Sequence, residues 1–223
     1  MKFSLVPICP AVVLCVCFAS TGLAWSKQQA PTSSESSSKS HRPVAHARSA
    51  TPDAGSMNDG VYRNPFFGFS YRAPYGWVDR TQDMQEGSEP GKSMVLLAMF
   101  ERPPEAAGDT VNSAVVIAAE SVALYPGLKT TADYFAPLTE LTTSKGFKVV
   151  NEPYEYSVGT KPLVRGDFSK EMGKLTMYQA SLVALQKGYV LSFSFVAGSS
   201  EEVDQLIEKL VFAVPRAAVA PKK

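Results

Sequence analysis

Cysteine is absent from most of this chain, because all three cysteines, Cys9, Cys15 and Cys17, lie within an apolar N-terminal run. The remainder therefore has no disulfide, no thiolate nucleophile and no cysteine-ligated metal. Histidine is equally scarce, and the only two, His41 and His46, lie in a serine-rich stretch. The part of the chain able to fold thus lacks the usual general base near neutral pH and the commonest metal ligand.

Phosphate-binding loops and basic stripes are also missing. Neither G-x-x-x-x-G-K-[ST] nor G-x-G-x-x-G occurs, and we predict no cofactor of any kind. The net charge of the whole chain is +1, but residues 59–216 hold 15 Lys and Arg against 19 Asp and Glu, a net charge of −4. A mildly acidic domain without clustered positive charge argues against nucleic acid as a partner.

Acidic side chains supply no strong motif either. Asp79, Asp83 and Glu86 crowd one predicted loop but lack the dense Asp/Asn-Gly spacing of a calcium loop, so a solvated loop is favoured and no metal is predicted. The serines of the domain have no histidine or cysteine partner. A pair of carboxylates or a Ser–Lys arrangement remains as a catalytic option, and we predict a protein that is not an enzyme.

Residues 1–26 are typical of a secretory signal peptide. Lys2 precedes an apolar run from Phe3 to Ala19, and Gly22-Leu23-Ala24 offers small residues at the −3 and −1 positions of a cleavage site. The run is slightly short for a bilayer span of ~20 residues, which disfavours a retained anchor. Lipidation at Cys17 is disfavoured by the bulky Val16 before it. We expect a periplasmic or secreted protein without a membrane span after cleavage.

Residues 27–58 have the composition of a flexible linker. The stretch is centred on S-S-E-S-S-S at residues 33–38 and contains almost no large apolar side chains, so burial cannot offset its ordering entropy. Lys39, Arg42, His46 and Arg48 raise the alternative of a surface-binding arm, but they are too sparse for a basic patch. Residues 217–223 are predicted to be a flexible tail.

Residues 59–216 show the patterns of an antiparallel sheet. In residues 64–77, N-P-F-F-G-F-S-Y-R-A-P-Y-G-W, Phe67, Phe69 and Tyr71 alternate with small or polar residues, which predicts one buried face, and Pro74 ends the strand. Residues 93–100 and 113–119 are apolar on both faces, as in central strands. Further strands are predicted at residues 147–151, 154–158, 162–169, 175–185 and 189–196, with turns at Met172-Gly173 and Lys187-Gly188.

Two segments have a helical period. Residues 130–145 begin with Thr130 and Asp133 at capping-box spacing, and Pro137 must either kink this helix or start a second one. Residues 199–210 begin with Ser199 and Glu202 at the same spacing and carry one apolar face.

These patterns resemble the PsbP/Mog1-like domain family. The resemblance rests on the entry strand G-F-S-Y-R-A-P-Y-G-W, a helix containing A-D-Y-F, and the strand K-G-Y-V-L-S-F-S-F that runs into A-G-S-S-E-E. It covers residues 59–214 and implies an α+β fold, an α/β/α sandwich whose central, mainly antiparallel sheet is flanked by helices. Known members are largely non-catalytic accessory or binding proteins, on photosynthetic membranes or with a small GTPase. The export signal disfavours a cytosolic GTPase partner here.

The most tempting candidate site is formed by Arg72, Tyr75 and Trp77. An aromatic pair beside a cation is the composition of a protein-binding hot spot. The competing interpretation, which we favour, is that Trp77 closes one end of the core and Arg72 is a solvated strand residue.

A second candidate is the pair Arg165 and Asp167, which are two residues apart on one predicted strand and therefore share a face. They are predicted either to form a polar site with Glu101 or Glu120, or to point outward and pair with neighbours, the favoured alternative.

The sequence therefore predicts an exported, non-catalytic binding or assembly module of the cell envelope, whose partner is another envelope protein. Two alternatives stay open. A carboxylate-based envelope hydrolase requires two acids about 5–10 Å apart in a cleft. A carrier of small apolar ligands requires a cavity of roughly 300 Å³ or more.

Overall fold

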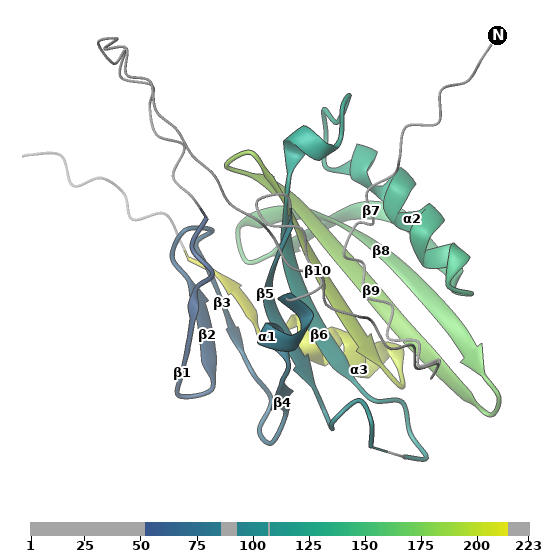
Figure 1. The fold of residues 1–223 in the computed structure, drawn as a ribbon. Helices are drawn as coiled ribbons and strands as arrows, with labels where there is room; N and C mark the ends of the chain where they lie inside the picture. Colours follow the sequence, from purple (N-terminus) through teal and green to yellow (C-terminus); the bar gives the residue numbers. More distant parts are fainter. Residues whose placement is uncertain (1–51, 86–92, 107, 214–223) are drawn as a thin grey trace, which may run out of the picture.

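Long apolar runs build a seven-stranded antiparallel sheet, with strands in the order β4-β5-β6-β10-β9-β8-β7 (Figure 1). The computed structural model describes residues 52–85, 93–106 and 108–213. The predicted signal peptide, the tail and most of the linker lie outside this range. The strands are β4 (Val78–Asp79), β5 (Ser93–Phe100), β6 (Ala114–Ser121), β7 (Lys148–Val158), β8 (Lys161–Met172), β9 (Leu175–Gln186) and β10 (Tyr189–Ala197).

A second, four-stranded antiparallel sheet has the order β1-β2-β3-β11 (Figure 1). This sheet joins the start of the domain to its end, because β3, near the start of the described chain, pairs with β11, near its end. Its strands are β1 (Ser56–Asn58), β2 (Val61–Asn64), β3 (Phe69–Arg72) and β11 (Leu210–Phe212).

The helices are short: α1 (Thr81–Gln85), α2 (Phe135–Ser144) and α3 (Ser200–Ile207), with 3-10 turns η1 (Val122–Leu124) and η2 (Ala132–Tyr134). The capping box before η2 is confirmed, since Thr130 N donates to Asp133 Oδ2 at 2.7 Å and Asp133 N donates to Thr130 Oγ1 at 3.3 Å. Pro137 lies in the first turn of α2, where its missing N–H leaves no helical bond unmade. It therefore starts a second helix. Among the described residues, no helix is long and apolar enough to cross a membrane.

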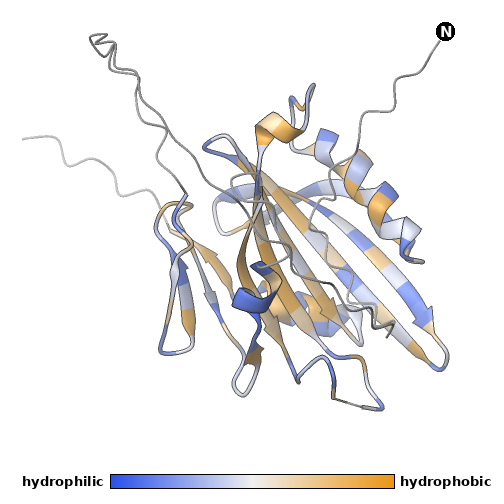
Figure 2. Ribbon diagram, viewed as in Figure 1, coloured by the Kyte–Doolittle hydropathy of each residue, from blue (hydrophilic) through white to orange (hydrophobic). Residues whose placement is uncertain are grey.

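The central strands of the large sheet are buried on both faces. On one face, Phe193 and Phe195 of β10 pack with Tyr71 of β3 and Leu206 of α3. On the other face, Val183 of β9 packs with residues of α2, and each such burial of a large apolar side chain contributes about 1.5–3 kcal/mol. Figure 2 shows the central strands as almost continuously hydrophobic, whereas β8 alternates along its length.

The α+β class and the mainly antiparallel sheet agree with the prediction, but the flanking layers differ from it. One face is covered by the small sheet together with α3, and α2 lies over the other face near β7 and β8 (Figure 1). The small sheet was not predicted, because three- and four-residue strands carry too little pattern to be recognised.

Three boundaries also differ from the prediction. Strand β1 lies within the stretch assigned to the linker, because Asp59-Gly60, both with positive φ, forms a two-residue hairpin turn that pairs it with β2. The strands predicted at residues 147–151 and 154–158 are one strand, β7, whose pairing register shifts twice. The turn predicted at Met172-Gly173 lies one residue later, since Met172 still pairs with Leu175.

Candidate functional site: a groove between two sheets

The turn after β3 presents an aromatic side chain to solvent. Pro74 has no N–H to extend the strand, and its carbonyl accepts from Trp77 N at 3.4 Å. Gly76 has a φ of +80°, which favours glycine at this position. Tyr75, between them, has a relative exposure of 104%. This short, closed turn therefore holds a tyrosine that buries nothing against its own domain.

A groove of about 610 Å³ runs beside this turn, between the two sheets. Apolar lining comes from the buried Met99 and from the half-buried Met57 and Trp77. Its polar lining comes mainly from four charged side chains, Asp59, Arg72, Asp79 and Lys209. The structure thus brings together the three residues proposed from the sequence, Arg72, Tyr75 and Trp77.

Both interpretations of Trp77 have a basis in the structure. Its side chain packs against the core cluster between the sheets, as an end plug would, and it also lines the groove.

The two cations of the groove come from neighbouring residues. Arg72 N donates to the carbonyl of Lys209 at 3.1 Å, so the two residues are neighbours. Among the described residues, neither side chain makes a hydrogen bond or an ion pair. By contrast, the carboxylate of Asp79 accepts from Thr81 N at 2.9 Å and from Thr81 Oγ1 at 2.6 Å. The lining thus holds two cations and two carboxylates, and neither cation forms an ion pair within the described residues.

Three residues that line the groove were not predicted from the sequence: Met57 in β1, Met99 in β5, and Lys209, which directly precedes β11. The Asp-Gly pair at 59–60 was a usable signal for β1, because this dipeptide favours a tight hairpin. No comparable signal marks Met99 or Lys209.

Arg165 and Asp167 form a second polar cluster, and they do share a face of β8 as predicted. Arg165 Nε donates to Asp167 Oδ1 at 2.7 Å, and Arg165 Nη1 lies 2.7 Å from Asp204 Oδ1 of α3. The second Asp167 oxygen accepts from Asn151 Nδ2 at 3.1 Å and from Tyr154 OH at 3.0 Å.

The favoured interpretation of this pair is confirmed in that both residues pair with neighbours, but it was wrong that they point outward. Both residues are buried, because α3 lies over this part of β8, and their partners are neither Glu101 nor Glu120. Burial lowers the pKa of Arg165, but the bonds to Asp167 and Asp204 outweigh it, so the net pKa is raised. Burial, and then the charge of Asp167, raises the pKa of Tyr154 to about 12. The cluster holds β7, β8 and α3 together as a closed set of bonds.

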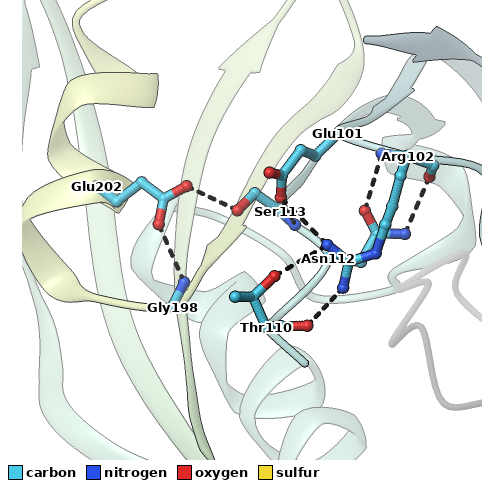
Figure 3. Close-up of polar contacts among 7 residues, drawn as sticks. All are labelled: Glu101, Arg102, Thr110, Asn112, Ser113, Gly198 and Glu202. Atoms are coloured by element: carbon cyan, nitrogen blue, oxygen red, sulfur yellow. Dashed lines mark hydrogen bonds and ion pairs between the residues drawn. The ribbon is translucent and has the colours of Figure 1, made fainter. Parts of the chain in front are cut away.

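The acids Glu101 and Glu202 converge on Ser113, as Figure 3 shows. Ser113 N donates to Glu101 Oε2 at 3.3 Å, and Ser113 Oγ donates to Glu202 Oε1 at 2.7 Å. The other oxygen of Glu202 accepts from Gly198 N at 3.3 Å, at the start of α3. These bonds fasten the loop before β6 to the start of α3, and this arrangement gives no specific support to a hydrolase.

Glu120 is likewise engaged, since it accepts hydrogen bonds from Tyr125 and from Tyr134.

The loop acids considered for a cation have other roles. Asp79 holds Thr81, Asp83 lies 2.6 Å from Arg80 Nε, and Glu86 is outside the described residues. No group of three or more His, Cys, Asp or Glu side chains within the described ranges is arranged to hold a metal ion.

Comparison with known proteins relates this chain to solved structures only. No family model and no curated protein sequence matches it. It is similar to cyanobacterial PsbP (CyanoP) from Synechocystis sp. PCC 6803, with 15% identity, a TM-score of 0.47, and coverage of 71% of this chain and 98% of that chain. It is also similar to the Ran-binding protein Mog1p of Saccharomyces cerevisiae, with 12% identity, a TM-score of 0.42, and coverage of 70% of this chain and 96% of that chain. A third similar structure is LpqN of Mycobacterium tuberculosis, involved in cell envelope biogenesis, with 16% identity, a TM-score of 0.39, and coverage of 74% of this chain and 90% of that chain.

PsbP and Mog1 represent the family that the sequence resembles, and at these identities the likeness concerns the fold alone.

Proposed function

We propose that this protein is a non-catalytic binding module that captures a partner protein at the groove formed by Arg72, Tyr75 and Trp77. The observation that carries this proposal is the fully exposed Tyr75, held by a rigid turn next to the groove. Rigid aromatic side chains beside a cation are typical hot spots, because they bury a large area on binding and lose little entropy.

The same proposal places the protein outside the cytoplasm, with residues 1–26 as a cleaved signal and the serine-rich stretch as a tether to the domain. Its partner is then another protein of the cell envelope. Mass measurement of the mature protein tests this part. A chain that begins at Trp25 or Lys27 supports cleavage, whereas a lipid-modified Cys17 at the N-terminus contradicts it.

Site-specific photo-crosslinking in the native envelope tests the binding site. A photoreactive residue in place of Tyr75 is expected to give one discrete adduct. The matched control is position 150, where Val150 of β7 has 51% exposure and lies away from the groove lining. Arg72→Glu, an exposed substitution with little expected effect on folding, should abolish the adduct at position 75. Equal adducts from both positions, or none from position 75, would contradict the proposal.

A small-ligand carrier remains a second candidate because the groove exceeds roughly 300 Å³, the lower range of ligand sites. Its lining is less suited to a purely apolar molecule, since it includes four charged residues: Asp59, Arg72, Asp79 and Lys209. A polar, partly apolar groove fits a peptide surface better.

A further inference from the structure

The face of the small sheet that points away from the large sheet is open to solvent. Tyr62, Tyr71 and Leu210 lie opposite one another across β2, β3 and β11, and all three are buried in the core between the sheets. Because side chains alternate along a strand, the neighbours of these residues point the other way. Figure 1 shows helices α1, α2 and α3 on the large-sheet side of the small sheet. Within the described residues, its other face is therefore uncovered.

Three cations lie on this outer face: Arg63 of β2, Arg72 of β3 and Lys209, the residue before β11. Arg72 and Lys209 lie directly opposite each other, since Arg72 N donates to the Lys209 carbonyl at 3.1 Å and continues the pairing of β3 with β11. Arg63 is a diagonal neighbour of Arg72, because Ser70 of β3 lies opposite Arg63. The other side chains of this face are uncharged: Ser56, Asn58, Val61, Ser70 and Val211.

The cations of this face have no carboxylate bound to them. In the part of the chain that the structure describes, none of the three makes an ion pair or a side-chain hydrogen bond. The acids nearest in sequence, Asp59 in the β1–β2 turn and Glu208 at the end of α3, lie at the rim of the face. Three cations thus exceed two rim acids, and like charges directly opposite each other on a sheet repel. An anionic ligand would relieve this repulsion.

The two flanks of the chain that adjoin this sheet are basic as well. Ser56 of β1 and Val211 of β11 lie in one row with Arg63, so the described chain enters and leaves the small sheet at the same end. Residues 27–51 hold four Lys and Arg against one Glu, and residues 214–223 hold three and no acid. The residues between these flanks hold 14 Lys and Arg against 20 Asp and Glu. The positive excess of the chain therefore adjoins the small sheet, while the domain as a whole is acidic.

This distribution of charge suits an extended anionic surface better than a single acidic patch on a protein. The composition of residues 27–51 predicts a flexible segment, which has no fixed shape to match to a protein. Such a segment is still attracted to a dense anionic surface, where each Lys or Arg raises the affinity roughly fivefold. Val211, which is 56% exposed in the row of Arg63, supplies an apolar contact for a lipid interface. The chemistry is that of an anionic bilayer.

We propose that the outer face of the small sheet, together with the two basic flanks, binds a bilayer that contains anionic phospholipid. Arg63, Arg72 and Lys209 lie against the lipid phosphates, and the large sheet faces away from the bilayer. This membrane-binding surface is additional to the groove proposed as a protein site. Because Arg63 does not line the groove, the two proposals can be tested separately.

Sedimentation of the full chain with lipid vesicles tests this inference. Binding to phosphatidylethanolamine vesicles with about one third phosphatidylglycerol should exceed binding to phosphatidylcholine vesicles, and should fall as salt screens the charges. The neutral vesicles report any binding by the apolar N-terminal run. Arg63→Glu should weaken binding to the anionic vesicles at least roughly tenfold, because it reverses a charge that faces the lipid.

The matched control is Lys174→Glu, which makes the same change of charge at an exposed lysine in the β8–β9 turn. This variant should bind the anionic vesicles as the native protein does. Equal binding of the native protein to both kinds of vesicle, or equal losses in the two variants, would overturn the proposal.

A second measurement does not depend on the folding of the charge variants. A photoreactive residue in place of Val211 should form lipid adducts on the anionic vesicles, whereas the same residue in place of Val150 of β7, with 51% exposure, should form none. Lipid adducts at both positions, or at neither, would overturn the proposed orientation. Protein adducts in place of lipid adducts at position 211 in the native envelope would overturn the bilayer and indicate an acidic protein.

The outcomes also separate this inference from the function proposed above. A protein adduct at position 75 without a preference for anionic vesicles would reject the membrane-binding surface alone. A preference for anionic vesicles that Arg63→Glu removes, without an adduct at position 75, would support the membrane-binding surface and reject the groove as a protein site.

Discussion

The two edges of the seven-stranded sheet are protected in different ways. Beyond the two residues of β4, the edge of β5 is closed by α1 and by Arg80, the residue before it. Arg80 N donates to Ala98 O at 2.8 Å, and Ala98 N donates to Thr81 Oγ1 at 2.9 Å. Gln85 Nε2, at the end of α1, donates to Val95 O at 2.7 Å. Here side chains and one backbone amide satisfy the groups that a further strand would otherwise pair with.

At the opposite edge, no further strand from the described residues pairs with β7, whose eleven residues are nearly all exposed. The irregular backbone of β7 protects this edge from pairing with another strand. Pro153 has no N–H, and the register shifts on both sides of Asn151. Asn151 and Tyr154 compensate by bonding to Asp167 through their side chains. Bulges and proline are common devices that prevent an edge from recruiting another chain. One edge is thus satisfied, and the other is made unsuitable for pairing.

The largest expected effect comes from breaking the support of β7. Arg165→Met should lower the free energy of unfolding by about 3–5 kcal/mol, because it leaves the buried carboxylate of Asp167 without its cation. Urea unfolding followed by tryptophan fluorescence measures this change. Asp204→Asn is the matched control, and it should cost under about 1 kcal/mol because Asp204 is 55% exposed. Equal losses for the two variants would contradict the central role of Asp167.

The next effect concerns the closed edge. Thr81→Val should lower the free energy of unfolding by about 1–3 kcal/mol, because the N–H of the fully buried Ala98 loses its acceptor. Thr81→Ser keeps the hydroxyl and should restore most of the stability. Hydrogen exchange at the Ala98 amide should accelerate in the valine variant alone. Unchanged exchange would show that Thr81 does not protect this edge.

A smaller change in stability, but a change in association, is expected at Pro153. Pro153→Thr restores an N–H to the open edge and should promote concentration-dependent self-association, with the free energy of unfolding altered by about 0.5 kcal/mol or less. Sedimentation velocity over a range of concentrations measures this. Pro153→Lys restores the same N–H but adds a charge, so this variant should show no more self-association than the native protein. If Pro153→Thr does not change self-association, the register shifts alone are enough to prevent this edge from pairing with another chain.

The smallest effect is expected from Tyr154 and depends on pH. Its pKa is raised from 10.0 to about 12 in the fold, so the neutral phenol is favoured by folding. The resulting stability is fully present below pH 10 and is lost as the pH rises toward 12. Tyr154→Phe should therefore show a shallower loss of stability across that range in unfolding experiments. Some loss should persist, because the pKa of Tyr62 is also raised to about 12. Identical pH profiles would contradict the shift at Tyr154.

Long, strongly patterned elements were predictable, and short ones were not. Residues 93–100 were predicted as a strand, and β5 has these bounds, because the seven consecutive apolar residues after Ser93 suit a strand covered on both faces. The start of α3 was equally predictable, since Ser199 Oγ accepts from Glu202 N at 3.1 Å as a cap should. Strands β1 and β11 have three residues each and owe their conformation to distant partners, which local pattern does not reveal.

Candidate sites show the same division. The shared face of Arg165 and Asp167 follows from the two-residue period of a strand, but their burial depends on α3, which follows them by more than thirty residues.

For the groove, the sequence by itself determined the turn, because Pro74 and Gly76 restrict the local backbone whatever surrounds it. Only the tertiary structure decided that Met57, Met99 and Lys209 lie beside that turn. Dihedral preferences act within a few residues, whereas a groove between two sheets exists only after strands from both ends of the domain have paired.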